Sequence, residues 1–385
     1  MKLVVYALAV GGLVGTNFNI ITGVTWGDIA ASILLIIAIV CHLLGKWRLD
    51  MFSKLSAIYL PFMLVSAIIN AELLNTIFIN YFRNYLWGIL FYDVLSNTIH
   101  SIKDIKRILV MFAAYLLFFL LNFKSMMDNT YYDTIATLDF GYGRNNVAFT
   151  ALLLSIFFLF LYYSKLLKFY ILVGIVLMSI IITFCASRYA MIMLVLSFIL
   201  FYLCSRKGTN LKEILLFLLI AVVGGVVYHF VIGFIDESFY EFSQSYLNDK
   251  INGAGNDFWT TRILEINVKP VTNVLQSNNP LLVLMFGAPE AIQHSFLSHT
   301  LITTGLIGCL CFVVTHIKIL FWSYQFKGVY FFLFLIVMVM FVNDFITNSR
   351  FIVTVNSMLY GMICAILYNY MKIYENFNIS NRDLR

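Results

Sequence analysis

Five ionisable residues of this chain stand at the starts of apolar segments, and their types suit anion binding and proton transfer. Arg144, Arg188 and Arg350 each open or precede an apolar run, and His294 stands just before another. Arg83 lies within the first turns of a fifth run. Guanidinium groups hold phosphates through paired hydrogen bonds, and helix N-termini attract anions. An imidazole, with a reference pKa of about 6.5, suits removal of a proton from a hydroxyl group.

The sequence around two of these arginines predicts a tight setting. Cys185-Ala-Ser-Arg188 leaves almost no loop between two apolar runs, and Ser187 is a suitable N-cap for the following helix. Arg144 follows Gly141-Tyr-Gly and precedes two asparagines, whose amides can hydrogen-bond near it. A cation at a helix N-terminus opposes the helix dipole at a cost of about 0.3–1 kcal/mol, so several together require an explanation. A bound anion supplies one.

Each arginine also has a structural interpretation. An arginine at a membrane edge is commonly an interfacial anchor or the partner of a nearby carboxylate. Arg350 can pair with Asp344, and Arg83 can stabilise a contact between helices. The expected anion ligands are Arg188, Arg262 and Arg144, with Arg350 and Arg83 as secondary candidates.

Two histidines, His294 and His299, stand at the start of the apolar run that follows the longest polar stretch. On one helix they would be about 140° apart and at different depths, so they do not face one substrate atom. We favour His294 as the catalytic base because it is nearer the polar boundary, with His299 and Glu290 as secondary candidates. Three other histidines are predicted to be structural: His42, His100 and His316.

The long polar stretch, residues 234–296, is predicted to be a loop that contains short helices. Phe239, Phe242 and Tyr246 recur at helical spacing and indicate an amphipathic helix at a membrane boundary. A second such helix would contain Arg262, at the edge of its apolar stripe. A salt bridge to Glu265, three residues on, is the structural alternative for this arginine.

The composition predicts an all-α polytopic membrane protein, because 62% of the 385 residues are hydrophobic and 11% are charged. No cysteine or histidine spacing indicates a disulfide framework or a metal site, and we expect neither metal nor cofactor. Twelve runs are long enough to cross about 30 Å of hydrocarbon. They lie near 3–21, 28–45, 55–72, 76–96, 107–122, 144–163, 168–186, 188–204, 213–233, 297–317, 328–346 and 351–370.

Most of the 25 lysine and arginine residues fall in alternate connections between these runs, together with both chain ends. The positive-inside rule makes that side cytoplasmic and puts the long loop outside. The net charge of +6 therefore reflects sorting across a membrane and does not indicate a nucleic-acid partner. The predicted division is 1–233 for nine membrane helices, 234–296 for the extracytoplasmic loop, 297–370 for three further helices and 371–385 for a cytoplasmic tail.

Three short motifs together resemble the O-antigen ligase/polymerase superfamily, the Wzy-type polymerases and their ligase relatives. They are Ala186-Ser-Arg188 at a tight outer turn, Thr261-Arg262-Ile-Leu-Glu265 in the outer loop, and Phe286-Gly followed by His294-Ser-Phe-Leu and Thr304-Gly-Leu-Ile-Gly308. Their order and membrane side agree with the family pattern between residues 144 and 308. Ser295 stands where the family commonly has asparagine.

The resemblance implies a GT-C-type glycosyltransferase of the bacterial cytoplasmic (inner) membrane, which would make O-antigen of lipopolysaccharide or capsular polysaccharide outside the cytoplasm. Its donor and acceptor would be glycans linked to undecaprenyl diphosphate, in the lipid bilayer, and a chain-length regulator protein is a further candidate partner. Arg188 and Arg262 would hold the diphosphate, and His294 would act on the acceptor hydroxyl. No metal is implied.

Two alternatives stay open. An O-antigen ligase would transfer the glycan to lipid A core by the same chemistry, and the sequence does not separate it from a polymerase. A lipid-linked oligosaccharide flippase or transporter would share the number of spans. It should show two similar halves of six spans and a cytoplasmic central loop, whereas this chain has a late outer loop and no evident repeat.

Overall fold

The computed structural model describes residues 2–21, 24–70, 76–127, 143–166, 168–185, 187–204, 272, 280–287, 296–324, 331–346 and 354–382. Within these ranges the regular secondary structure is helical, apart from one small hairpin of strands β1 (Asn19–Ile21) and β2 (Val24–Thr25), which pair antiparallel. The helices before the long loop are α1 (Lys2–Gly15), α2 (Trp26–Leu43), α3 (Met51–Ala57), α4 (Tyr59–Ile69), α5 (Thr76–Ser96), α6 (Ile102–Met127), α7 (Gly143–Tyr163), α8 (Lys168–Phe184) and α9 (Arg188–Cys204). The later helices are α13 (Pro280–Phe286), α14 (Phe296–Tyr324), α15 (Phe331–Ile346) and α17 (Thr354–Arg382).

The described helices form an all-α bundle with membrane character. Four stretches are long and apolar enough to cross a membrane: Trp26–Leu43, Met51–Ile69, Asn146–Tyr163 and Thr303–Tyr324. Helices overlap every predicted span except 213–233, which lies outside the described residues, as does most of the predicted loop. The number of about twelve spans and the GT-C type stay predictions.

Several helices differ from their predicted outlines. The first predicted span, 3–21, is helical only to Gly15, and its last residues, Asn19–Ile21, form strand β1. The third span is broken at Ile58 into α3 and α4, which remain nearly continuous. Helix α17 continues to Arg382, well past the predicted end at 370, so most of the predicted tail is helical. Helix α14 is kinked at Gly305, which has φ 65° and ψ −174°.

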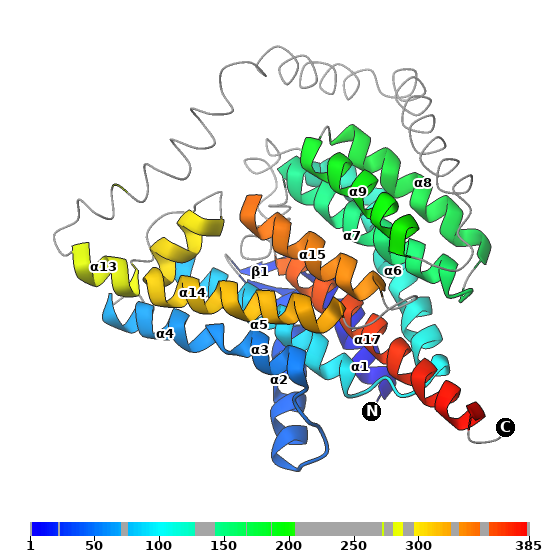
Figure 1. Ribbon diagram of the computed structural model, residues 1–385, viewed down its shortest axis with the longest axis horizontal. Coiled ribbons are helices and arrows are strands. Elements are labelled where there is room, and N and C mark those ends of the chain that lie inside the picture. The colour runs from blue at the N-terminus through cyan, green and yellow to red at the C-terminus, as the bar shows by residue number, and fades with distance from the viewer. Residues whose placement is uncertain are drawn as a thin grey trace.

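Helices α5 and α17 form the spine of the bundle and pack side by side (Figure 1). Glycines allow this close approach: a Cβ atom on Gly361 would collide with the Gly88 carbonyl, and one on Gly88 would collide with Ser357. Large aromatic side chains, such as Tyr92, Phe112 and Phe160, fill the core around the spine. Close backbone packing at small residues is the usual way in which membrane helices associate.

Exposed apolar side chains cover the outside of several helices. On α2 they include Ile33, Ile36 and Val40, and on α14 they include Leu310 and Phe321. In a protein transferred to water such surfaces would be unfavourable, but they match the hydrocarbon of a bilayer. This exposed apolar surface supports the assignment of the chain as a membrane protein.

The bundle has two polar ends, which we name after one residue of each. The Arg83 end contains the starts of α2, α7 and α17 and the second turn of α5, joined by side-chain contacts. The Asp104 end contains the starts of α1 and α6 and the end of α5. Because α2, α5, α7 and α17 run in the same direction, the N-terminal dipole ends of these helices point toward the Arg83 end.

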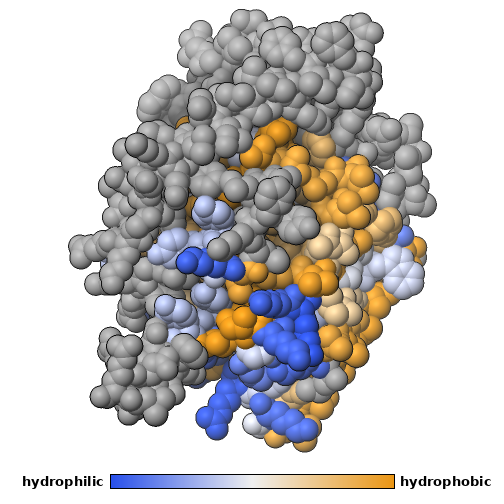
Figure 2. All heavy atoms as spheres, turned by 90° about the vertical axis from the view of Figure 1, so that its right-hand side faces the viewer, coloured by the Kyte–Doolittle hydropathy of each residue, from blue (hydrophilic) through white to orange (hydrophobic). Residues whose placement is uncertain are grey.

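The Asp104 end has a basic surface. Its exposed basic residues are Lys46, Arg48, Lys54, Lys103, Lys106 and Arg107. Figure 2 views the molecule from the right-hand side of Figure 1 and shows hydrophilic residues gathered in the lower part of that face, beside hydrophobic surface. At the left of Figure 1, α13 lies next to α4 and to the first part of α14.

Candidate functional site

At the Arg83 end, a buried carboxylate holds the arginine. Arg83 Nη1 donates to Asp28 Oδ2 at 3.2 Å, and Trp87 Nε1 donates to Asp28 Oδ1 at 2.9 Å. Asp28 also completes a capping box with Thr25 at the start of α2, where each side chain accepts from the other residue's backbone N–H. The pair agrees with the structural interpretation of Arg83, since its charge is compensated by a carboxylate in a low-dielectric setting.

A second set of buried polar groups connects α5, α7 and α17. Thr354 Oγ1 donates to Asn84 Oδ1 at 2.6 Å, and Asn84 Oδ1 also accepts from Arg83 Nε at 3.4 Å. The Thr150 hydroxyl lies 2.6 Å from Asn356 Oδ1. Asn84, Thr150 and Asn356 are all essentially inaccessible to solvent. These contacts fix the starts of the three helices relative to one another, because hydrogen bonds in an apolar interior have few alternative partners.

Near these buried polar groups, two potential hydrogen-bond donors have no partner within the described residues. Asn356 Nδ2 and Ser357 Oγ are buried and have no hydrogen-bond partner there. The Thr150 hydroxyl also reaches the Asn146 carbonyl at 2.9 Å, and a hydroxyl has one proton to donate. The first turn of α17 therefore contains buried polar groups without hydrogen-bond partners, a costly condition that a bound water commonly relieves.

The structure describes the predicted anion ligands only in part. Arg144 is the second residue of α7, and Arg188 is the first residue of α9, but their side chains are outside the described part. Ser187 accepts from the Ala190 N–H at 3.5 Å, which confirms the predicted N-cap before Arg188. Arg262 and Arg350 are outside the described residues. Their convergence with Arg188 stays a prediction.

Helix α9 is connected to α15 just beyond Arg188. The Tyr189 hydroxyl donates to the Val339 carbonyl at 2.9 Å. Asp344 and its neighbour Asn343 are completely buried near the end of α15. The suggested pairing of Asp344 with Arg350 is not described by the structure.

Of the candidate catalytic residues, only His299 belongs to a described helix. His294 and Glu290 are outside the described residues, and His299 belongs to the first turn of α14 with its side chain undescribed. About two turns further along this helix, α4 contacts it: Ser66 Oγ donates to the Thr303 carbonyl at 2.5 Å, and the Tyr59 hydroxyl lies 3.3 Å from Thr304 Oγ1. Helix α4 therefore packs against α14 directly before the kink of α14 at Gly305.

The three histidines predicted to be structural have ordinary structural contacts. His42 Nε2 lies 2.7 Å from Asp93 Oδ2, and the His100 backbone N–H donates to Asp104. The His316 ring stacks on Phe312 with ring centroids 3.7 Å apart. These contacts agree with a structural role for His42 and His316, whereas His100 is exposed and contributes its backbone N–H.

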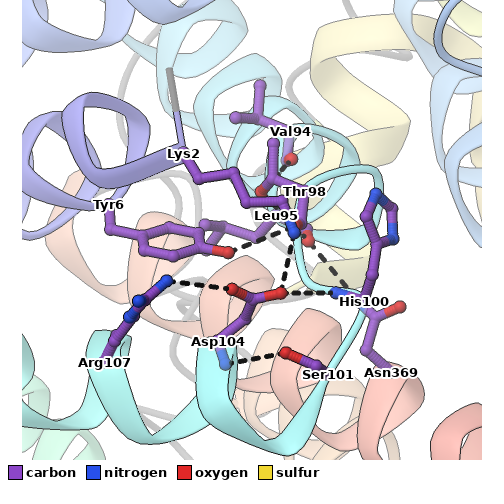
Figure 3. Close-up of polar contacts among 10 residues, drawn as sticks. All are labelled: Lys2, Tyr6, Val94, Leu95, Thr98, His100, Ser101, Asp104, Arg107 and Asn369. Carbon is purple, nitrogen blue, oxygen red and sulfur yellow. Dashed lines mark hydrogen bonds and ion pairs between the residues drawn. The ribbon is translucent and has the colours of Figure 1, made fainter.

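An ion-pair cluster around Asp104 closes the opposite end (Figure 3). Lys2 Nζ donates to Asp104 Oδ2 at 2.7 Å, the His100 N–H donates to the same oxygen at 3.2 Å, and Arg107 lies 3.7 Å from Oδ1. Burial alone would raise the pKa of Asp104, but the hydrogen bonds from Lys2 and His100 outweigh it and hold that pKa below its ordinary value of 3.8. The cluster attaches the first residue of α1 to α6.

Sequence reasoning did not single out Asp28, Asn84, Thr150 or Asn356, the buried polar residues that join helices at the Arg83 end. A usable signal was present, since each is a polar residue inside or beside an apolar run. Polar residues within membrane helices commonly face the bundle interior and pair there. Within the described residues no group of histidine, cysteine, aspartate or glutamate side chains could hold a metal ion.

In comparisons with known proteins, the chain shows no significant match to any protein-family model, curated protein or solved structure.

Proposed function

We propose that this protein is a membrane glycosyltransferase that polymerises undecaprenyl-diphosphate-linked oligosaccharide repeat units at the outer face of the bacterial cytoplasmic membrane. The product would be O-antigen or capsular polysaccharide. The observation that carries the proposal is the placement of α7 and α17 with their starts at the Arg83 end, because Arg144 opens α7 and Arg350 precedes α17. The order of motifs shared with the O-antigen ligase/polymerase superfamily supplies the reaction class.

The electrostatics of that end favour an anion. Each helix N-terminus is equivalent to roughly +0.5 charge, and several parallel helices add to the arginines near their starts. Arg83 is compensated by Asp28, so it contributes less to this field. We therefore assign the diphosphate to Arg188 and Arg262, with Arg144 in support.

The basic surface supports the proposed orientation in the membrane. Lys46, Lys103 and Lys106 are exposed at the Asp104 end, and lysines accumulate on the cytoplasmic side of membrane proteins. The Arg83 end would then face outward, together with both flanks of the long polar loop. Lipid-linked repeat units would be met at that surface.

The proposed reaction needs no nucleotide sugar. The acceptor hydroxyl oxygen attacks the anomeric carbon of the donor, a new glycosidic C–O bond forms, and the bond from that carbon to the phosphate oxygen breaks. The diphosphate leaves with the electron pair, where guanidinium groups stabilise its developing charge. The hydroxyl proton passes to His294, whose neutral form can accept it near pH 7.

A deletion strain tests the proposal. Loss of the ladder of long polysaccharide chains, with single repeat units still attached to lipid A core, is the expected result and separates a polymerase from the alternatives. A ligase would leave polymer on the undecaprenyl carrier and none on lipid A core. A flippase would leave repeat units facing the cytoplasm. Either of the last two results would contradict polymerisation.

A further inference from the structure

Helix α14 is divided into two parts at Gly305. We name residues 296–304 the α14 head and residues 306–324 the α14 stem. Gly305 has a backbone conformation that is essentially restricted to glycine, and a Cβ atom there would collide with the backbone of Met285 and Phe286 in α13. The kink therefore exists where the head and α13 touch.

One face of α4 contacts both partners of this junction. Ser66 and Asn70 are four residues apart, so they lie on the same face of the helix. Ser66 Oγ donates to the Thr303 carbonyl in the head at 2.5 Å. Asn70 Nδ2 donates to the Gly287 carbonyl, directly after α13, at 2.7 Å. Through these two bonds, α4 holds Gly287, which follows α13, and Thr303, near the end of the head.

The same side-chain types elsewhere in the bundle behave differently. Ser155 and Ser179 donate to carbonyls four residues earlier in their own helices, which is the usual arrangement for a serine in a membrane helix. Asn122 likewise donates to Phe118 in its own helix. Ser66 donates across to α14, and Asn70 donates both to its own helix and to Gly287. Their contacts are specific to the junction.

We propose that Ser66 and Asn70 are positioning residues that hold the end of α13 and the α14 head on α4 as one unit. The inference rests on the proposed function in one respect: the head includes His299, and His294 is two residues before it in sequence, so the unit sets the position of the candidate base. Ser66 and Asn70 need not touch substrate. Small displacements of a reacting group cost rate because catalysis depends on a near-attack geometry.

The first arm of the test needs no substrate. Thr300 Oγ1 in the head lies 3.4 Å from Cys309 Sγ in the stem. In a protein with Cys309 as the only native cysteine, Thr300→Cys should form a disulfide with it under mild oxidation, read out by loss of maleimide labelling. Adding Ser66→Ala or Asn70→Ala should slow this oxidation at least threefold, because the released head lowers the effective concentration of the two thiols. Ser155→Ala and Asn122→Ala are the matched controls and should leave the rate unchanged.

The second arm measures polymerisation by the purified full-length protein with lipid-linked repeat units. Ser66→Ala and Asn70→Ala should lower kcat about 10–100-fold and change KM little, since the misplaced group acts in the chemical step. Ser66→Thr keeps the hydroxyl and should retain most of kcat. A merely structural role would instead lower protein abundance and leave kcat per folded molecule unchanged.

Unchanged oxidation in both alanine variants would overturn the inference, and so would slowed oxidation with an unchanged kcat. Absence of polymerisation by the parent protein, with oxidation still slowed by the two variants, would reject the proposed function and retain the junction. The two failures are therefore distinguishable.

Discussion

Thr150 of α7 and Asn356 of α17 lie 2.6 Å apart, oxygen to oxygen, although 206 residues separate them in the chain. Both side chains are fully buried, and the contact sets the register between the two helix starts near Arg144 and Arg350. Thr354 likewise reaches Asn84 of α5 across 270 residues. The Arg83 end is thus held by polar contacts inside an apolar bundle.

Breaking the Thr150–Asn356 contact should destabilise the bundle by about 1 kcal/mol, the usual net value of a buried hydrogen bond. Thr150→Val removes the hydroxyl and keeps the shape, and Asn356→Leu removes the partner. In a double-mutant cycle followed by thermal unfolding in detergent, the two losses should be less than additive. Ser155→Ala, which affects a bond within α7 only, is the control. Strict additivity would mean that the two side chains are not coupled.

The position of the long loop can be tested by labelling. Ser243→Cys in a cysteine-free background should react with a membrane-impermeant maleimide in intact spheroplasts, because the loop is predicted to be outside. Lys46→Cys, at the exposed Asp104 end, should react only after lysis. The reverse pattern would invert the topology.

The Asp104 cluster predicts a dependence of stability on pH. The pKa of Asp104 is lower in the folded protein than its ordinary value, so its contribution is complete above the unfolded pKa of about 3.9 and is lost as pH falls through the folded value. Wild type should therefore melt above Asp104→Asn at neutral pH, and the difference should shrink as the pH is lowered below about 4. A difference that grows on acidification would contradict the assigned direction of the shift.

The candidate base can be separated from its neighbour by substitution. His294→Ala should lose about 10²–10⁴-fold in the rate of chain extension while donor lipid still binds, as expected for removal of a general base. His299→Ala should have the milder defect. Near-parental extension by His294→Ala would place the base elsewhere, and Glu290 would be the next residue to replace.

Much of the helical framework followed from the sequence. The prediction of 76–96 coincides with α5, and 188–204 coincides with α9, because the length of an apolar run and its charged borders determine a membrane helix. The helical tail was not predicted, since 371–385 was assigned as a cytoplasmic tail after a span that ended at 370. The stretch 371–382 contains neither glycine nor proline, so no residue in it stops the helix.

Contacts between distant helices were beyond sequence reasoning. Asn84 and Thr354 are each a single polar residue beside apolar ones, and nothing in either run specifies the register that joins them. The kink at Gly305 was equally hidden, although Gly305 stands in a quoted motif. Its requirement for glycine arises from the close approach of α13, a contact between segments. Of the candidate site, the N-cap Ser187 is confirmed, and the roles of Arg188, Arg262 and His294 stay predictions.

The central claim is that guanidinium groups at the Arg83 end activate a lipid-diphosphate sugar donor. Its most direct test is polymerisation in vitro by purified protein with undecaprenyl-diphosphate-linked repeat units, comparing wild type, Arg188→Ala and Arg188→Lys. We predict polymer from wild type, none from Arg188→Ala at equal protein level, and poor rescue by lysine, because a point charge does not reproduce bidentate phosphate contacts. Full polymerisation by Arg188→Ala would contradict the account.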